Sequence, residues 1–272
     1  MAWWLMARVV LLSVERIALR QLGQGAPPGS VMAWAYAGAA AVLWIGAVFA
    51  GRGAWNGSAW LAAAIYGGAF AAYAWALQKG PVSVVSPWAN ATAVLLFLVH
   101  PIGGVLAWAG VAAFLGGIVL LGGANLTPGV AAMMVSDGLL AWGRLTDAHL
   151  AGDPWSYGAT LYTLVAAGMT LGARLAGPVL PEWARLWRRR PGWVLVAPAV
   201  NGASYLTLLV LMARLGPAPA EAASGLAGLG GALLGRIWLK EAGTRPGWVG
   251  VGLMTAGAIA VLYDHGLGFR VK

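Results

Sequence analysis

The sequence predicts an all-helical polytopic membrane protein, and three observations lead to that prediction. Of the 272 residues, 60% are hydrophobic and only 9% are charged, whereas soluble domains usually carry about 25% charged residues. The mean hydropathy is +0.77. Apolar runs of the roughly 20 residues needed to cross a bilayer follow one another along the chain. The first run is too long for a cleavable signal peptide and contains Arg8.

Clusters of glycine, proline and charged residues divide the chain into ten expected transmembrane helices. We place these helices at 3–22, 30–50, 57–78, 82–99, 102–122, 128–148, 155–176, 192–213, 218–238 and 246–264. Several connections are very short, which implies antiparallel neighbours in a bundle. The long connection is 177–191, so we expect no soluble domain.

Charge and residue types exclude several classes of function. The net charge is +9, but the basic residues gather at the ends of expected spans, notably in "WARLWRRRPGW" at 183–193. That placement is typical of membrane orientation and argues against a nucleic-acid partner. The chain has no cysteine and three scattered histidines, so we expect no metal site and no cofactor. No phosphate loop or catalytic triad is present, so we expect no enzyme and no ATP-driven transport.

The two halves of the chain resemble each other. The segment "ALQKGPVSVV" at 76–85 aligns with "MARLGPAPAE" at 212–221, and "WAGVAAFLGGIVLL" at 108–121 aligns with "WVGVGLMTAGAIAVL" at 248–262. We therefore expect two five-helix repeats, 1–125 and 126–272. Because five is odd, the second repeat enters from the opposite side of the membrane. Inverted repeats of this kind commonly build transporters whose site lies near the midplane.

The stretch from 206 to 263 resembles the end of an EamA-type domain of the drug/metabolite transporter superfamily. The likeness lies in the Gly-Pro before the ninth helix, the "WLKE" at its end and the glycine-rich tenth helix; "ERIALRQLGQGAPPGSVMAW" at 15–34 resembles that family's first hairpin. The first half departs from the pattern, since "LVHPIGG" has no acid where Leu239-Lys240-Glu241 stands in the second half. The resemblance implies a ten-helix secondary carrier with a central cavity lined by helices one, three, four, six, eight and nine.

The first expected helix carries charges inside an apolar run. At 100° per residue, four side chains share a sector roughly 140° wide: Arg8, Glu15, Arg16 and Arg20. A charge that faces lipid at the bilayer centre costs at least about 2.5 kcal/mol, so this sector is expected to face protein or water. We predict that Glu15 faces the cavity and changes its protonation or its ion partner during transport, with Arg8 and Arg16 as pairing groups. The alternative is a static ion-pair network that orients the helices.

The sixth and ninth expected helices also carry embedded charges. Asp137 lies near the middle of its helix, and Arg144 follows seven residues later on the same face. Arg8 and Glu15 have the same spacing with the signs exchanged, so an inverted repeat is able to bring acid and base together. We assign Asp137, Arg144 and Glu221 to ion coupling or ion pairing. For Glu221, close to a helix N-terminus, plain stabilisation by the helix dipole is the alternative.

Polar and aromatic residues near the middle of other spans are the candidates for binding a solute. Proline at 87 frees a backbone carbonyl of the fourth helix, where serine and asparagine offer hydrogen-bonding groups. The candidates are Ser86, Trp88, Asn90, Tyr73, Asn201 and Tyr205. Interhelical hydrogen bonding and packing is the alternative role for each of them.

We therefore expect a secondary active transporter of small organic solutes such as amino acids or amines, working by alternating access. The alternatives are a proton-coupled antiporter of aromatic or quaternary cations and, in another class, a lipid flippase or a membrane scaffold. The expected partners are a small-molecule substrate, protons and membrane lipid, with a monomer or homodimer in a prokaryotic inner membrane. The distribution of basic residues between loops places both termini outside, whereas the family resemblance implies both inside.

Overall fold

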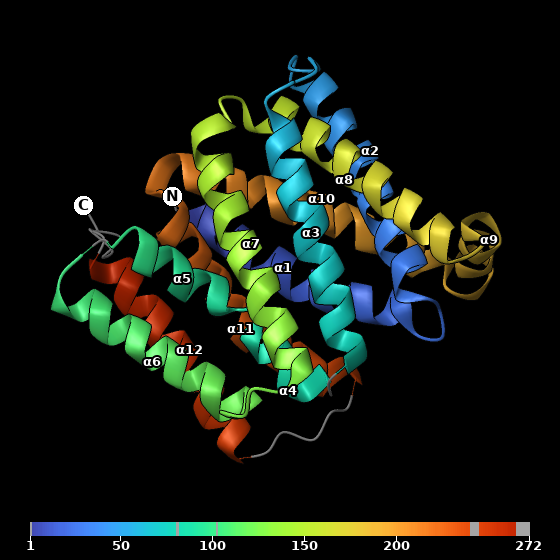
Figure 1. The fold of residues 1–272 in the computed structure, drawn as a ribbon. Coiled ribbons are helices and arrows are strands. Elements are labelled where there is room, and N and C mark those ends of the chain that lie inside the picture. Colours follow the sequence, from blue (N-terminus) through green and yellow to red (C-terminus); the bar gives the residue numbers. More distant parts are fainter. Residues whose placement is uncertain (1, 80–81, 102, 240–244, 265–272) are drawn as a thin grey trace. The chain divides into compact units, whose positions relative to one another are not determined.

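The computed structural model describes residues 2–79, 82–101, 103–239 and 245–264, and within these residues every regular element is a helix. Figure 1 shows the helices in chain order. They are α1 (Ala2–Gly23), α2 (Pro28–Phe49), α3 (Ala59–Lys79), α4 (Val82–Trp88), α5 (Ala91–Val99), α6 (Val105–Gly122), α7 (Pro128–Leu150), α8 (Pro154–Ala176), α9 (Val179–Arg189), α10 (Pro191–Leu215), α11 (Pro217–Leu239) and α12 (Arg245–Leu262).

Nine of the ten predicted helices coincide with a single helix of the structure, and two predictions need correction. The helix expected at 82–99 is broken into α4 and α5, because Pro87 and the Asn90 that precedes α5 interrupt it. The connection expected at 177–191 contains the amphipathic helix α9. By length and composition, four described helices are able to cross a membrane, namely α2, α6, α8 and α10. The ten-span topology and the inverted repeat stay predictions.

Several helix ends follow directly from local sequence. Proline occupies the first position of α2, α7, α8, α10 and α11, where its missing N–H costs nothing and its fixed φ favours the helix. Asp153 caps α8 by accepting a hydrogen bond of 3.0 Å from the backbone N–H of Ser156. Gly123 and Gly216 follow α6 and α10 with φ of 77° and 84°, a backbone conformation that favours glycine.

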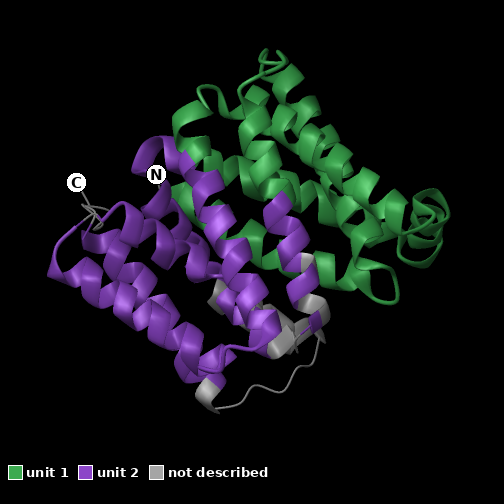
Figure 2. Cartoon of the chain, in the orientation of Figure 1, with its two compact units in different colours: residues 1–67, 146–210 green, residues 68–145, 211–272 purple. Residues whose placement is uncertain are grey.

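The helices form two compact units, coloured separately in Figure 2. The first unit contains residues 1–67 and 146–210, and the second contains 68–145 and 211–272. Each unit therefore takes comparable segments from both predicted repeats. The unit boundaries fall inside α3, α7 and α10, so these helices contribute residues to both units.

The first unit is built around the packing of α2 against α8. Small residues suit α2 to close packing: Ala33, Ala35, Ala39 and Ala47 are all fully buried, and a Cβ added to Gly29 would lie 3.7 Å from the Cβ of Ala173 on α8. Helix α10 also packs against α2, since a Cβ added to Gly202 would lie 3.0 Å from the carbonyl oxygen of Ala39. At these positions α2 thus meets its neighbours through small residues and close backbone contact.

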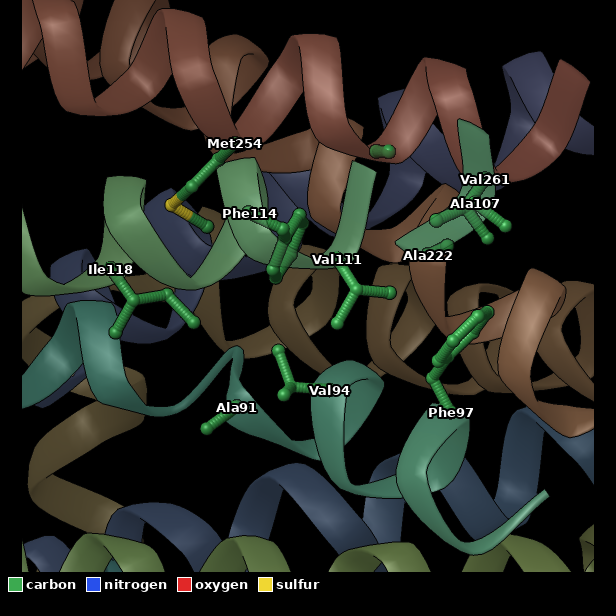
Figure 3. Packing of buried hydrophobic residues seen from close by; sticks show 11 residues of the cluster. Ala91, Val94, Phe97, Ala107, Val111, Phe114, Ile118, Ala222, Met254 and Val261 are labelled. Atoms are coloured by element: carbon green, nitrogen blue, oxygen red, sulfur yellow. The ribbon is translucent and has the colours of Figure 1, made fainter. Parts of the chain in front are cut away.

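The second unit is built around the antiparallel packing of α6 against α12. Two glycine pairs bring the backbones together: a Cβ on Gly110 would lie 2.7 Å from the carbonyl oxygen of Gly257, and a Cβ on Gly117 would lie 2.5 Å from that of Gly250. Beside them lies an apolar cluster, shown in Figure 3, in which Phe114 and Met254 are buried between α5, α6, α11 and α12.

Candidate functional site

The first unit buries a carboxylate among three tyrosines. Asp147, near the end of α7, is 0% exposed. Its Oδ1 accepts a hydrogen bond of 2.7 Å from the hydroxyl of Tyr157. Its Oδ2 accepts hydrogen bonds of 2.5 Å from Tyr66 and 2.6 Å from Tyr205. Because charge-assisted hydrogen bonds are short and strong, this arrangement is suited to holding an ionised carboxylate and to tying α3, α7, α8 and α10 together.

The tyrosines of this cluster continue into a chain of tilted ring contacts. The ring of Tyr205 lies 4.7 Å from that of Tyr162, which in turn lies 5.1 Å from that of Tyr36. The hydroxyl of Tyr162 donates a hydrogen bond of 3.1 Å to Oδ1 of Asn201. Two predicted solute-binding residues, Asn201 and Tyr205, are therefore buried and engaged with other side chains of the same unit.

Arg8 is a buried cation of this unit. It is 5% exposed, and its Nη1 donates hydrogen bonds of 2.8 Å and 2.6 Å to the carbonyl oxygen and the hydroxyl of Ser204. Ser204 is the neighbour of Tyr205, so α10 carries groups that contact a buried cation and a buried anion at adjacent positions. The charged sector predicted on the first helix accordingly faces protein at Arg8, whereas Arg20 is exposed.

The second unit buries a different carboxyl group, at Asp137 in the middle of α7. Asp137 is 0% exposed, and its Oδ1 accepts a hydrogen bond of 2.8 Å from the hydroxyl of Thr92 in the first turn of α5. The other oxygen, Oδ2, is buried and has no hydrogen-bond partner. The neighbouring Ser136 donates a hydrogen bond of 2.8 Å to the carbonyl oxygen of Ala69 and so fixes α7 against α3. One oxygen of the buried carboxyl group is thus left open to a proton or a ligand.

Two other charged residues of the second unit form an ion pair. Arg144 donates a hydrogen bond from Nε to Oε1 of Glu221, with side chains 11% and 10% exposed. Within the second unit, Arg144 therefore pairs with Glu221 and not with Asp137, whose Oδ1 accepts from Thr92. The reason is geometric: Arg144 is two helical turns farther along α7, where it faces the start of α11.

The helix break between α4 and α5 gathers other predicted residues. Asn90 precedes α5, and its Nδ2 donates a hydrogen bond of 3.0 Å to the carbonyl oxygen of Pro87. Trp88 packs against Gly122, and its indole N–H is buried without a partner. Tyr73 and Trp88 both border the cluster that contains Met133, one turn before Asp137. The structure therefore brings Trp88, Tyr73 and Asp137 into one region of the second unit.

For three predicted site residues, Glu15, Arg16 and Ser86, the individual contact partners are not assigned. Glu15 and Arg16 are partly buried on α1, and each interacts with a neighbouring group. The side chain of Ser86 lies outside the described structure, as do Lys240 and Glu241.

Two important residues were missing from the sequence prediction. Asp147 was overlooked because it lies next to the expected end of its helix, where an acid is unremarkable. Its partners Tyr66 and Tyr205 are 81 and 58 residues away in the chain, so only the fold reveals the cluster. Thr92 was overlooked because a threonine within an apolar helix usually bonds to its own backbone. Its place five residues after Pro87, at the start of a new helix, was the available signal.

These features define an α-helical protein with helices of membrane-spanning length and with carboxyl groups buried inside each unit. A solved structure described only as the crystal structure of a protein has the same fold: the TM-score is 0.74 and the identity is 20%, over 95% of this chain and 96% of that one. At that identity the likeness shows the fold alone. No family model and no curated protein matches the chain.

Proposed function

We propose that this chain is a secondary active transporter of small organic solutes that works by alternating access. The observation that carries the proposal is Asp137, a carboxyl group buried in an apolar helix with one oxygen left without a partner. Ionisable groups inside membrane helices are costly and usually mark ion or substrate pathways. A purely structural acid would have both oxygens hydrogen-bonded or would face a cation.

The break between α4 and α5 adds to this support. Discontinuous helices supply free backbone groups and helix ends to the sites of many secondary transporters. Here Thr92, in the first turn of α5, is the group that donates to Asp137. In this proposal Asp137 takes up a proton on one side of the membrane and releases it on the other, while Trp88 and Tyr73 contact the solute. Glu15 stays a second candidate for coupling.

The packing of α6 against α12 supports the predicted inverted repeat. The sequence alignment equates Gly110 with Gly250 and Gly117 with Gly257. The observed close contacts join Gly110 to Gly257 and Gly117 to Gly250, and a two-fold axis between the helices would exchange these two contacts. Inverted repeats are a common basis of alternating access.

An antiporter of aromatic or quaternary cations is the second candidate function. It is favoured by the indole ring of Trp88 in the same region as Asp137, because an aromatic face beside a carboxyl group suits an organic cation. A flippase or a scaffold is the alternative from another class.

Counterflow in proteoliposomes tests the proposal. The probes are radiolabelled amino acids, amines and sugars, with tetraphenylphosphonium as the aromatic cation. A transporter gives saturable counterflow of at least one probe, and Asp137→Asn should lose accumulation driven by a pH gradient while it retains exchange. Glu15→Gln, measured in parallel, decides which acid couples. Asp153→Asn is the matched control, because asparagine caps a helix as well as aspartate does.

Each outcome decides between the alternatives. Saturable flux of tetraphenylphosphonium alone favours the antiporter. Scrambling of fluorescent lipid without solute flux supports a flippase, and the absence of both activities supports a scaffold. Full gradient-driven transport by a stably folded Asp137→Asn protein overturns the role given to Asp137.

A further inference from the structure

Helix α9 (Val179–Arg189) is anchored to the first unit by one of its faces. Val179 and Leu186 are 3% and 4% exposed. Trp183 donates a hydrogen bond of 3.0 Å from its indole N–H to the carbonyl oxygen of Ser30, and its ring lies 5.1 Å from that of Trp34. Because the hydrogen bond and the ring contact both involve α2, the orientation of α9 about its own axis is determined.

The rest of α9 is divided into an apolar side and a cationic side. At 100° per residue, Trp187, Leu180 and Ala184 occupy a sector about 60° wide next to the buried face. Leu180 is 61% exposed and Trp187 is 41% exposed. Arg188, Arg185 and Arg189 occupy the following sector, about 100° wide, and all three are exposed.

The cations of this surface are largely free to meet a partner. Arg185 contacts Glu182 at 2.5 Å, but its side chain remains 54% exposed. Arg188 and Arg189 form no ion pair with any other residue in the described part of the chain. Arg190, just after the helix, donates hydrogen bonds of 2.7 Å to Gln21 and 2.6 Å to Gln24, which fixes the chain against the end of α1.

The direction of α9 matches a position at the membrane surface. In Figure 1, α9 is seen nearly along its axis, whereas α2 and α8 are seen from the side. Helix α9 therefore runs across the two candidate spans that it contacts. A helix with this direction, with one exposed apolar side and one exposed cationic side, fits the boundary between acyl chains and headgroups.

We propose that α9 is a binding surface for anionic phospholipids. Leu180, Ala184 and Trp187 enter the acyl boundary, and Arg185, Arg188 and Arg189 contact the headgroup phosphates of the same leaflet. Guanidinium groups suit this task because they bind phosphate oxygens in pairs. The inference concerns lipid and is independent of the proposed transport, so either proposal is able to fail alone.

The chain lacks cysteine, which makes single-cysteine labelling of the full protein direct. Nitroxide labels at Leu180→Cys and Pro181→Cys report depth in nanodiscs, because the two positions lie about 100° apart around the helix. The label at 180 should be accessible to oxygen from the acyl region, and the label at 181 should be accessible to a water-soluble nickel complex. Equal accessibility of both labels to the nickel complex would show that α9 lies in water and would overturn the proposal.

Lipid specificity is measured by mass spectrometry of the phospholipid retained in nanodiscs of phosphatidylcholine and phosphatidylglycerol. The double change Arg188→Gln and Arg189→Gln should reduce the preference for phosphatidylglycerol about 25-fold, or about fivefold for each arginine, since a basic residue near an anionic surface contributes about 1 kcal/mol. The control, Arg52→Gln with Arg214→Gln, removes the same charge elsewhere. An unchanged preference in the first variant, or an equal loss in the control, overturns the proposal.

Discussion

The hydroxyl of Tyr205 donates a hydrogen bond of 2.6 Å to Oδ2 of Asp147, a carboxylate that is 0% exposed. Tyr66 and Tyr157 donate to the same carboxylate. Tyr205, which the sequence predicts to bind a solute, therefore belongs to a buried network. A network in which every donor has an acceptor rigidifies a core, whereas a network that loses its acceptor is costly. We therefore expect the Asp147 cluster to contribute strongly to the free energy of unfolding of the first unit.

The first prediction concerns that network. Tyr157→Phe should destabilise the protein by about 2 kcal/mol, because hydrogen bonds to charged groups contribute more than neutral ones. Asp147→Asn should cost more, since an amide carries one acceptor oxygen for three hydroxyl donors. The measurement is the thermal unfolding midpoint in detergent, with Tyr263→Phe as the control because Tyr263 is 63% exposed. Equal midpoints for Tyr157→Phe and the control contradict the prediction.

The second prediction concerns the ion pair between Arg144 and Glu221. Arg144→Gln should destabilise the protein by about 3 kcal/mol, because it leaves the carboxylate of Glu221 buried without its cation. The double change Arg144→Gln with Glu221→Gln should recover most of the loss. A double-mutant cycle on the unfolding midpoint gives the coupling energy. Additive losses in the two single variants would show that the contact contributes nothing.

The sequence predicts the helices well because each apolar run is a strong local signal. It misses α9 because that helix has only 11 residues and a polar side, too short and too charged for a span. The break after Trp88 is predicted in part, because Pro87 has no N–H and so leaves a backbone carbonyl of the same helix without its hydrogen-bond donor.

The candidate site is harder to predict because its contacts join residues that are distant in the chain. Asp137, Trp88 and Arg144 stand out as unusual residues within apolar runs, so the sequence identifies them. The pairings do not stand out: Thr92, which donates to Asp137, is a common residue in helices, and Glu221, although itself predicted, is 77 residues from Arg144. Sequence patterns thus indicate which residues are costly to bury, whereas the fold decides which groups compensate for that cost.

The third prediction tests the close packing of α6 against α12. Gly117→Ala should destabilise the protein by about 2 kcal/mol, as overpacking commonly does, because the added Cβ would lie 2.5 Å from the carbonyl oxygen of Gly250. Gly116→Ala is the adjacent control, since a Cβ there meets nothing within 4 Å. That control should be neutral or slightly stabilising, because alanine favours a helix. Similar unfolding midpoints for the two variants would argue against the glycine contact.

The fourth prediction concerns pH. Burial raises the pKa of Asp153, but hydrogen bonds from Ser156 and the charge of Arg52 outweigh it, so the pKa lies below its ordinary value of 3.8. The pKa of Asp153 is thus lower in the folded state than in the unfolded state. The stabilisation is therefore present above about pH 4 and is lost as the pH falls through the pKa of the folded state. Asp153→Ala should cost about 1 kcal/mol at neutral pH and progressively less in acid. A cost that does not change between neutral and acidic pH would assign the effect to something other than the carboxylate.

The fifth prediction is the side of the membrane on which each loop lies. If α9 binds anionic lipid, its loop faces the cytoplasmic leaflet, which carries the negative surface potential. With the predicted ten spans, five spans separate Ser58 from α9, so the loop at Ser58 should be outside, as should both termini. Single cysteines at Ser58 and Pro181, the water-facing position of α9, provide the measurement in intact cells, because a membrane-impermeant maleimide should label the first and not the second. Labelling of both positions would rule out an odd number of spans between them. Labelling of Pro181→Cys alone would place α9 outside and both termini inside, as the family resemblance implies.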